Sequence, residues 1–373
     1  MTTLDRRPLL GFATDDAGLK GLSSDWDELL KDAYAPGIFQ TWAWISSWRR
    51  TLGSGHDLLV ATARDPRRGH LLGLAPFAVE TRRVGPLTTR VLRMAGSGPA
   101  APDHLDMIVR HGHPHIAAPL WDAVKAQRYW DLVDLDGLRP DSHLAGLMLR
   151  RSSDRHDFST PTMCPVLPLP ASWEEYEASL GRNLRQNLRR YARKLDASHN
   201  TVVERLVVRD HEVTDTVKRL AEFHQQIRTA RGDRGSFADP LMIDFHRTAA
   251  LRFLEAGRLR LHRLDVDGRM AAAISCFRHG ETVSFYATGY DPALAAYGPG
   301  RRVLAAAIRS AIDEGATRFD FLRGDEAYKR SWLAVDAFDE HIRMPVGAKG
   351  RLISQAGAAV RPLRSLKAHL RRN

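Results

Sequence analysis

The chain has 373 residues, of which 43% are hydrophobic and 27% are charged, and its formal net charge is +11. This composition can fill real hydrophobic cores and excludes an intrinsically disordered chain. No apolar run approaches the roughly 18 residues of a membrane-spanning helix, so we expect no stable membrane insertion. The first ten residues lack the apolar segment of a secretory signal, and two cysteines are too few for a disulfide framework. These features predict a cytoplasmic protein of two or three domains with a surface that attracts anions.

In the first half of the chain, helices are expected to alternate with antiparallel strands. A helix over 24–34 precedes a second helix that carries Trp42, Trp44 and Trp48, a cluster more typical of core packing than of a binding site. An Asp-Pro-Arg-Arg-Gly turn joins the first two strands. The predicted strands are 57–63, 70–80, 90–95, 105–109 and 130–136, and the further helices are 115–128 and 141–151.

Four prolines between residues 160 and 170 prevent a helix there and predict an extended crossover. One long helix is then expected over 173–197, beginning with Ser172 and Glu175 as a capping box. Beside its apolar stripe runs a stripe of arginines, which consists of Arg182, Arg185, Arg189 and Arg193. This basic ridge predicts contact with RNA phosphates, a lipid diphosphate or a phosphorylated sugar, although a solvated basic face would give the same pattern.

The second half repeats the order of the first, with antiparallel strands followed by strand–helix–strand. The expected strands are 258–266, 270–278, 282–290 and 317–322, with a helix at 300–314. This repeat predicts two copies of one α+β fold, with a helical insertion at about 210–256 between them. The expected boundaries are 1–160 for an N-terminal domain, 161–256 for the crossover and helical region, 257–345 for a C-terminal domain and 346–373 for a basic tail.

A glycine-rich turn lies between the strand 282–290 and the following helix. It reads Tyr297, Gly298, Pro299, Gly300, Arg301 and Arg302. Glycines let the backbone approach a ligand, and a helix N-terminus offers amides without intrahelical partners. The two arginines add positive charge for a phosphate. The turn therefore predicts an anion site, for example for a pyrophosphate, with an ordinary tight turn as the alternative.

Charged residues gather at two further places. One group lies at the end of the strand 317–322 and just after it, and comprises Asp320, Arg323, Asp325, Glu326, Tyr328 and Lys329. The other is Asp103, His104 and Asp106. Asp320 or Asp103 could take a proton from an amine, and Lys329 could hold a phosphate or an acyl carbonyl. Surface ion pairs would produce the same clusters. His111, His113 and His115 lie in a Gly- and Pro-containing loop, so no metal site is expected.

Three stretches together resemble the Gcn5-related N-acetyltransferase (GNAT) superfamily, in its CelD-like (BioF2-like) branch, which is related to the FemAB peptidyltransferases. They are Asp-His-Leu-Asp at 103–106, Phe-His…Arg-Gly…Phe at 223–237 with the basic helix before it, and Pro-Gly-Arg at 299–301 with the motif at 320–332. The resemblance implies tandem domains, an α/β sandwich in which each domain has a mixed β-sheet flanked by helices. It also implies acyl transfer to an amine or hydroxyl, with a splayed strand pair that admits a pantetheine arm. The loop here is shorter than the superfamily pattern, and relatives with such a loop include enzymes that take aminoacyl-tRNA.

These inferences assign the chain as an acyltransferase that moves an acyl group from acyl-CoA, for example acetyl-CoA, or a similar thioester to an amine. The acceptor is expected to be a small molecule, glycan or peptide in polysaccharide, cell-envelope or natural-product biosynthesis, held partly by the degenerate N-terminal domain. The alternatives are an aminoacyl-tRNA-dependent transferase with tRNA as a partner and a non-catalytic binding module.

The expected roles are then as follows: catalytic, Asp320, Asp103 and Lys329; donor-binding, Tyr297, Gly298, Gly300, Arg301, Arg302 and, by the resemblance, Thr288 on the splayed strand; substrate-binding, His104, Asp106, Arg185, Arg189, His224, Asp325 and Trp332.

Overall fold

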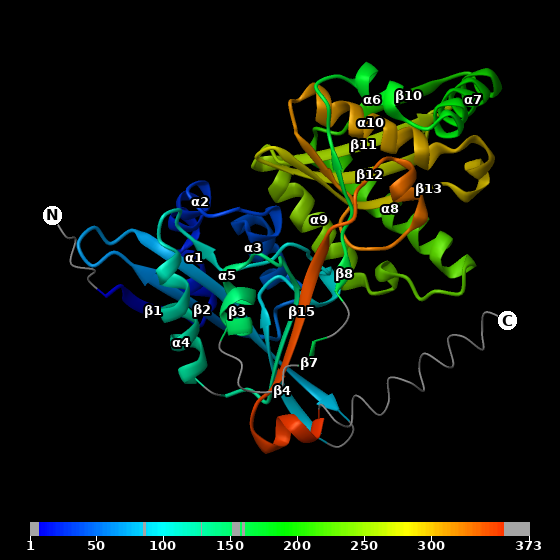
Figure 1. Ribbon diagram of the computed structural model, residues 1–373. Coiled ribbons are helices and arrows are strands. Elements are labelled where there is room, and N and C mark those ends of the chain that lie inside the picture. The colour runs from blue at the N-terminus through cyan, green and yellow to red at the C-terminus, as the bar shows by residue number, and fades with distance from the viewer. Residues whose placement is uncertain (1–6, 85–86, 128, 151–156, 159–160, 354–373) are drawn as a thin grey trace.

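The computed structural model describes residues 7–84, 87–127, 129–150, 157–158 and 161–353. The chain forms two halves, each built on one β-sheet with helices packed against it (Figure 1). Among the described residues, no helix is both long enough and apolar enough to cross a lipid bilayer. Of the predicted basic tail at 346–373, residues 354–373 lie outside the described residues.

The first half contains a nine-stranded sheet whose main path runs β1-β2-β3-β4-β6-β15-β7, with β5 paired to β3 and β8 paired to β15. Its strands are β1 (Leu9–Ala13), β2 (Asp57–Arg64), β3 (Leu71–Val84), β4 (Leu87–Met94), β5 (Ile108–Val109), β6 (Leu132–Leu138), β7 (Asp157–Phe158), β8 (Thr162–Met163) and β15 (Phe338–Pro345). Its helices are α1 (Asp16–Gly21), α2 (Ser23–Lys31), α3 (Trp42–Arg50), α4 (Ala117–Gln127) and α5 (His143–Arg150).

The second half contains a six-stranded sheet in the order β10-β11-β12-β13-β14-β9. Its strands are β9 (Val166–Pro168), β10 (Val202–Leu206), β11 (Leu259–Val266), β12 (Arg269–His279), β13 (Thr282–Tyr290) and β14 (Arg318–Asp320). Its helices are α6 (Trp173–Ser179), α7 (Arg182–Ser198), α8 (Asp210–Ala230), α9 (Pro240–Glu255), α10 (Pro299–Asp313) and α11 (Ala327–Ser331).

The two sheets share one plan, which agrees with the predicted repeat. In each, three antiparallel pairings are followed by one parallel and one antiparallel pairing: β4 and β6 are the parallel pair in the first sheet, and β13 and β14 in the second. Helices α8 and α9 follow β10 as α1–α3 follow β1. The expected fold, tandem mixed sheets flanked by helices, is therefore confirmed.

In each sheet, the strand that follows the parallel pair comes from a distant part of the chain. Strand β9, from the proline-rich crossover, pairs with β14 in the second sheet, whereas β15, which follows the second sheet, pairs with β6 in the first. Figure 1 shows β15 running from the second half into the first sheet. This exchange was not predicted. Residues 257–345 were expected to form one domain, but β15, which lies within them, belongs to the sheet of the first half. The boundaries themselves remain a prediction.

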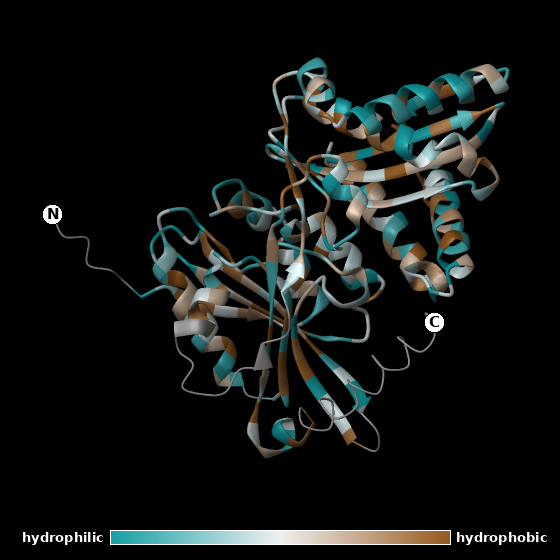
Figure 2. Cartoon of the chain, turned by 45° about the vertical axis from the view of Figure 1, so that its right-hand side comes forward, coloured by the Kyte–Doolittle hydropathy of each residue, from teal (hydrophilic) through white to brown (hydrophobic). Residues whose placement is uncertain are grey.

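The helices of the second half cover both faces of its sheet, since alternate residues of β12 enter different cores. Ala273 and Phe277 pack in the core that contains α8 and α9, and Ala272 and Ile274 pack in the core that contains α10. The first of these cores continues into the first half, where Trp44 contacts the ring of Phe245 on α9 at 4.8 Å between centroids. The tryptophan cluster is thus core packing, as expected. Figure 2 shows brown, hydrophobic segments on the strands of both sheets, between white and teal ones, and also on several helices.

Most predicted elements of regular structure are present, but the predicted helix over 173–197 is broken. Leu180 and Gly181 are extended, with ψ angles of 144° and 141°, and they separate α6 from α7. Leu180 is buried, so the break directs an apolar side chain into the core between two helices. The predicted cap at Ser172 is present, because its Oγ accepts a hydrogen bond from the Glu175 N–H at 3.1 Å.

Candidate functional site

Strands β13 and β14 part after a short parallel pairing. The pairing joins Thr282–Ser284 to Arg318–Asp320, and β13 then continues to Tyr290 paired only with β12. Residues 285–290, which β14 no longer flanks, are called the unpaired part of β13. The chain after β14 turns sharply, because Oδ1 of Asp320 accepts a hydrogen bond from the Leu322 N–H at 2.8 Å. Leu322 itself has a positive φ of 54°. This separation of the two strands agrees with the splayed pair that the resemblance implies, and its use as a donor site stays a prediction.

A bulge lies in β13 next to this splay. Ser275 of β12 pairs with Ala287 and Cys276 pairs with Phe285, so Tyr286 is the extra residue. Its hydroxyl donates to the Ala100 carbonyl in the first half at 2.7 Å. A bulge re-aims backbone groups at the edge of a strand. The predicted donor residue Thr288 lies two residues further along, and its hydroxyl donates to the Ala273 carbonyl at 3.0 Å.

At the point where the strands part, His104 of the first half meets two buried carboxylates. Its Nε2 lies 2.9 Å from Oδ2 of Asp320 on β14, and its Nδ1 lies 2.9 Å from Oδ1 of Asp339 on β15. The Asp339 carboxylate also accepts the backbone N–H of His104 at 2.6 Å. Burial opposes a charge on the ring, but the two carboxylates outweigh it and hold the pKa of His104 well above 6.5. His104 is the most accessible of the three, with 22% side-chain exposure against 6% for Asp320 and 1% for Asp339.

A second cross-link joins the halves beside this cluster. Arg323, in the loop after β14, reaches Oδ1 of Asp103 through Nη2 at 2.7 Å and Asp136 of β6 at 3.0 Å. The Arg323 backbone N–H donates to the second oxygen of Asp103 at 2.8 Å. Burial raises the pKa of Asp103 to about 6, although Arg323 acts in the opposite direction. Both oxygens of Asp103 are thus held by one arginine, which makes Asp103 a poorer candidate base than Asp320.

Lys329 is buried and its amine faces the loop that carries Arg323. Its Nζ donates to the carbonyls of Leu322, Arg323 and Gly324 at 3.1, 2.9 and 3.1 Å, and it lies 3.0 Å from a carboxylate oxygen of Glu326. An ammonium group has three donors, and these carbonyls can use all of them. The geometry therefore suits a lysine that shapes the loop, and the predicted direct role in chemistry stays untested.

Three predicted substrate residues lie in other surroundings. Asp106 accepts the backbone N–H groups of His143 and Leu144 at the start of α5, at 2.7 and 3.0 Å. Trp332 is buried with 1% exposure, and Asp325 forms an exposed ion pair with Arg330 at 2.7 Å. Among the described contacts of His104, none involves these three residues. The structure therefore does not bring them together with the cluster of His104, Asp320 and Asp339.

His224 lies on α8 where this helix crosses the unpaired part of β13. A Cβ added at Gly289 would lie 3.1 Å from the His224 backbone nitrogen, so helix and strand are in close contact. The ring packs on Phe237 at 5.1 Å, and its Nδ1 has no hydrogen-bond partner. Burial, helped by Arg228, lowers the pKa of His224 to about 4. His246 of α9 was not predicted; it packs 4.9 Å from Tyr286, and burial, together with His224, lowers its pKa to about 3.

The glycine-rich turn before α10 offers fewer free amides than its sequence suggests. The Gly298 N–H donates to the Ala295 carbonyl at 3.1 Å, and the N–H groups of Arg301 and Arg302 both donate to the Gly298 carbonyl at 3.0 and 3.2 Å. Pro299 has no N–H. Among the residues of this turn, all of them described, Gly300 alone keeps an amide without a backbone acceptor. The predicted pyrophosphate site therefore has a weaker backbone cradle than expected.

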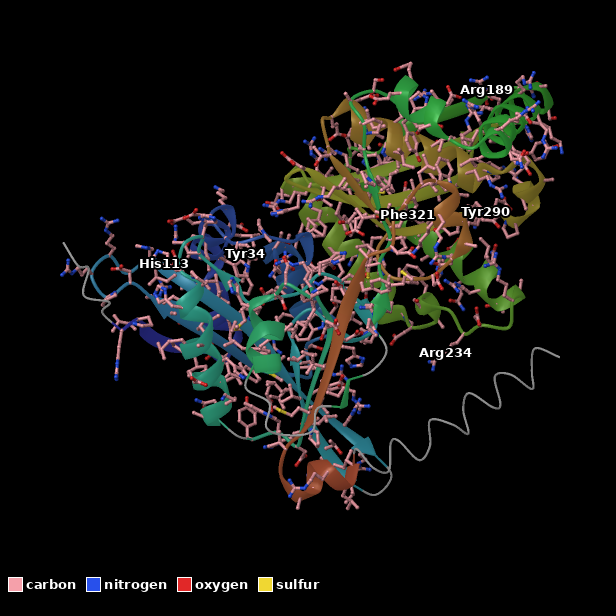
Figure 3. The ribbon with its side chains drawn as sticks, viewed as in Figure 1. Tyr34, His113, Arg189, Arg234, Tyr290 and Phe321 are labelled. Carbon is pink, nitrogen blue, oxygen red and sulfur yellow. The ribbon has the colours of Figure 1, made fainter. Side chains whose placement is uncertain are left out.

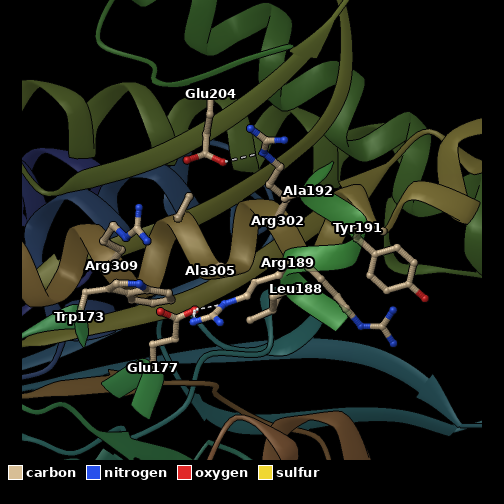
Figure 4. Close-up of a pocket in the computed structure, with 13 residues that line it drawn as sticks. Trp173, Glu177, Leu188, Arg189, Tyr191, Ala192, Glu204, Arg302, Ala305 and Arg309 are labelled. Carbon is tan, nitrogen blue, oxygen red and sulfur yellow. Dashed lines mark hydrogen bonds and ion pairs between the residues drawn. The ribbon is translucent and has the colours of Figure 1, made fainter. Parts of the chain in front are cut away.

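The basic residues predicted on α7 and at the turn are partly brought together. Arg189, Arg301 and Arg302 line one pocket between α7 and α10, whereas Arg185 donates to the Ala178 carbonyl at 3.1 Å and is not part of the lining. Tyr297 packs beside α7, with the Lys194 amine 4.7 Å from its ring. The pocket lies at the far edge of the sheet from the splay, and Figure 3 places Arg189 at the outer edge and Phe321 toward the junction of the halves. Figure 4 shows this pocket in close-up.

One described group could supply metal ligands. Ligand atoms of His104, Cys164 and Asp339 lie within 4.8 Å of one another. Burial and nearby carboxylates strongly raise the pKa of the Cys164 thiol, so this sulfur is a protonated, weak ligand. His104 is already held by Asp339. The expectation that the protein needs no metal remains a prediction.

The geometry above agrees with comparisons to known proteins. A family model described as an acetyltransferase (GNAT) domain matches residues 182–330. The chain contains a GNAT domain. FemX is similar in structure, with a TM-score of 0.61 at 12% identity over 86% of this chain and 95% of that one. A conserved protein of unknown function from Bacteroides thetaiotaomicron has a TM-score of 0.56 at 13% identity over 91% and 100%. L-PGS from Bacillus licheniformis has a TM-score of 0.51 at 11% identity over 92% and 94%.

These likenesses show the fold, since the identities are low. No curated protein matches the chain in sequence. The predicted resemblance to the GNAT superfamily is confirmed for residues 182–330, and FemX shares the fold of the chain.

The central cluster extends beyond the matched GNAT domain. Asp320 and Arg323 lie within residues 182–330, whereas His104 comes from the first half and Asp339 from β15. Asp339 and His246 were missed by the sequence reasoning. The alternation in Phe338–Pro345 is a weak strand signal, and nothing local indicates that its partner is β6.

Proposed function

We propose that the protein transfers an acyl group from a thioester donor to an amine, at the place where β13 and β14 part. The contact between His104 and Asp320 is the single observation that carries this proposal, because it places a titratable ring at the splay of a GNAT domain. The acyl group would lie along the unpaired part of β13, next to the bulge at Tyr286. The acceptor would approach between the halves, where His104 has its exposed edge.

The reaction needs one C–N bond to form and one C–S bond to break. The acceptor attacks as a free amine, after an ammonium form has lost a proton to solvent. Nδ1 of the His104 imidazolium is held by Asp339, and Nε2, which lies 2.9 Å from Asp320 without a hydrogen bond to it, donates its proton to the departing thiolate. The neutral ring then takes the proton that the acceptor nitrogen loses, so His104 returns to its starting form. Asp320 and Asp339 keep the ring oriented and favour its charged form.

A transfer assay tests this proposal. Purified protein would be screened with short- and long-chain acyl-CoAs against amine acceptors, and released thiol would be measured. We expect thiol release that depends on the acceptor and that falls about 100-fold or more in His104→Gln. Unchanged thiol release in this variant would contradict the role of His104. Lack of any transfer, with ligand binding retained, would favour a binding module of this fold.

A second candidate donor is aminoacyl-tRNA, and two observations favour it. The turn before α10 keeps only the Gly300 amide free of a backbone acceptor, and α7 carries a row of exposed cationic side chains, among them Arg182, Arg189 and Arg193. Thermal stabilisation by CoA, acetyl-CoA and tRNA at two salt concentrations separates the donors. Stabilisation by acetyl-CoA alone supports the thioester, whereas stabilisation only by tRNA, steeply lost with salt, supports the second candidate.

A further inference from the structure

The parallel pair of the first sheet parts after a short pairing, as β13 and β14 part in the second sheet. Val91 and Leu92 of β4 pair with Leu132 and Val133 of β6, and β6 then continues to Leu138 without β4. The other edge of β6 is covered by β15 as far as Leu138. The first half therefore has a splay of its own, which corresponds in the order of strands to the one where the reaction is proposed.

The chain itself fills the edge of β6 that β4 leaves. The Leu105 N–H donates to the Gly137 carbonyl at 2.6 Å, and the Leu105 carbonyl accepts the Arg139 N–H at 3.3 Å. Leu105 thus forms a parallel bridge with Leu138. Because β15 pairs with Leu138 from the other side, Leu105 lies on the edge that faces β4. Residues 102–105, which we call the plug segment, occupy the splay of the first sheet.

His104 is the accessible tip of the plug segment. Its neighbours Pro102, Asp103 and Leu105 are buried, whereas His104 is not. The φ of His104 is 60°, in the left-handed region that is uncommon for residues other than glycine. Such a conformation persists where the surrounding structure enforces it. Here the buried neighbours hold the backbone on both sides, and Asp339 accepts its N–H at 2.6 Å. The plug segment therefore fixes the direction in which the ring leaves the chain.

Gly137 allows the plug segment to approach β6 closely. It lies at a bulge, because Asp136 and Gly137 of β6 face the single residue His341 of β15, and its φ is 75°. A Cβ added at Gly137 would lie 2.6 Å from the Pro102 carbonyl oxygen. That oxygen is also held in place, since it accepts a hydrogen bond from Nη2 of Arg323 at 2.9 Å. A side chain at this position must therefore push the plug segment away from β6.

We propose that Gly137 is a positioning residue for the acyl transfer, which acts on His104 through the plug segment. The inference rests on the proposed function, in which His104 exchanges a proton. The plug segment holds the backbone of His104, while Asp339 binds Nδ1 of its ring and Asp320 lies 2.9 Å from Nε2. A shift of the plug segment would move the ring from both carboxylates and leave the unpaired part of β13 in place. The first half then serves the reaction by holding one side chain at the splay of the second half.

Gly137→Ala in the full-length protein tests this role, with Gly112→Ala as the matched control. Both glycines have a positive φ, 75° and 78°, but a Cβ at Gly112 would meet nothing within 4 Å. We expect Gly137→Ala to lower kcat about tenfold or more, because a small misplacement of a reacting group is costly. The KM for the donor should stay unchanged, since the donor is proposed to lie along β13. The kcat should also decline at a lower pH than in the wild type, because a ring moved from its carboxylates loses its proton more easily.

Equal changes in Gly112→Ala would overturn the proposal, because they would trace the effect to backbone strain alone. A folded Gly137→Ala with the kcat and the pH profile of the wild type would overturn it as well. So would a raised KM for the donor at unchanged kcat.

The titration of the His104 ring tests the same role without transfer activity. NMR of the full-length protein with labelled histidines follows the ring, and His104→Gln identifies its signal. The midpoint should be lower in Gly137→Ala and unchanged in Gly112→Ala; an unchanged midpoint in folded Gly137→Ala would overturn the proposal. A lowered midpoint in a protein without transfer activity would instead overturn the proposed function alone. The charged side chains around the ring are those of Asp103, Asp320, Arg323 and Asp339.

Hydrogen exchange of the wild type needs no variant and covers the case in which Gly137→Ala does not fold. The amides of His104 and Leu105 are bound to the Asp339 carboxylate and the Gly137 carbonyl. We expect a peptide that covers residues 102–107 to exchange as slowly as β6. Fast exchange of this peptide beside slow exchange of β6 would show that the plug segment does not hold His104, and would overturn the proposal.

Discussion

Nε2 of His104 lies 2.9 Å from Oδ2 of Asp320, although the two residues are 216 positions apart along the chain and belong to different halves. The contact forms at the last paired residue of β14, where β13 continues without β14. Asp339 holds the other ring nitrogen from β15, the strand that returns to the first sheet. The exchange of strands therefore completes the candidate site as well as joining the halves.

The first prediction concerns how the two carboxylates act on His104. Asp320→Asn and Asp339→Asn should each lower kcat, and both should shift the pH profile of kcat to lower pH, because each removes a charge that raises the pKa of the ring. A double-mutant cycle with His104→Gln should show that the effects are not additive. Additive losses, or losses of activity with an unchanged pH profile, would indicate that the carboxylates only support folding.

The second prediction concerns the anchor of β15 and its dependence on pH. Asp134 of β6 accepts a hydrogen bond from Nε2 of His341 on β15 at 2.6 Å and lies 3.1 Å from Arg93. Burial opposes the charge of Asp134, but these partners outweigh it and lower its pKa to about 2. A lowered pKa stabilises the fold above the unfolded value near 3.8, and this contribution is lost as the pH falls toward 2.

Asp134→Asn should therefore lower the free energy of unfolding by about 2 kcal/mol at neutral pH. Urea denaturation should show that this difference in the free energy of unfolding shrinks between about pH 4 and pH 2. These limits correspond to the pKa of Asp134 in the unfolded and in the folded state. Asp141→Asn is a suitable control, since the Asp141 side chain is 61% exposed in its ion pair with Arg139. A difference that stays constant over this pH range would contradict the assigned charge of Asp134.

Much of this fold could be predicted because its signals are local. Strands such as β11, β12 and β13 alternate or run apolar between clear turns, and their predicted ends differ from the observed ones by one residue at most. The exchange of β9 and β15 could not be predicted, because pairing of β15 with β6 joins residues that lie about two hundred positions apart. Local patterns carry no information on such partners.

The candidate site divides in the same way. Asp103, His104 and Asp320 could be named because polar groups gather near the ends of predicted strands. Only the fold shows that Arg323 binds Asp103 and that Asp339 holds His104. At the turn around Gly298 the sequence pattern misleads, because its glycines suggest free amides that the structure shows mostly bonded. A short 3-10 helix, Pro292–Tyr297, leads into it, and the amides bond within the turn.

A third prediction separates shape from chemistry at Lys329. Lys329→Met should lower the free energy of unfolding by about 3 kcal/mol, because the carbonyls of Leu322 and Arg323 would be left buried without a donor. Activity should fall with the altered loop, and Arg323→Gln should reduce both stability and activity through the same loop. Urea denaturation and thiol release measure the two effects. Full stability with complete loss of transfer would instead assign Lys329 a direct role in the reaction.

The last prediction tests the contact of α8 with the unpaired part of β13. A Cβ added at Gly289 would lie 2.5 Å from the Leu220 carbonyl oxygen, which is backbone and cannot rotate away. Gly289→Ala should therefore push α8 from the strand and cost about 1–3 kcal/mol of unfolding free energy. Gly21→Ala is the control, because a Cβ there meets nothing within 4 Å. Since the acyl group is proposed to lie along this part of β13, donor binding should weaken in Gly289→Ala beyond the loss of stability. Calorimetric titration below the melting temperature measures this change. Unchanged stability and unchanged binding would contradict this prediction. They would show that α8 can shift away from β13 without a measurable effect on the fold or on the donor site.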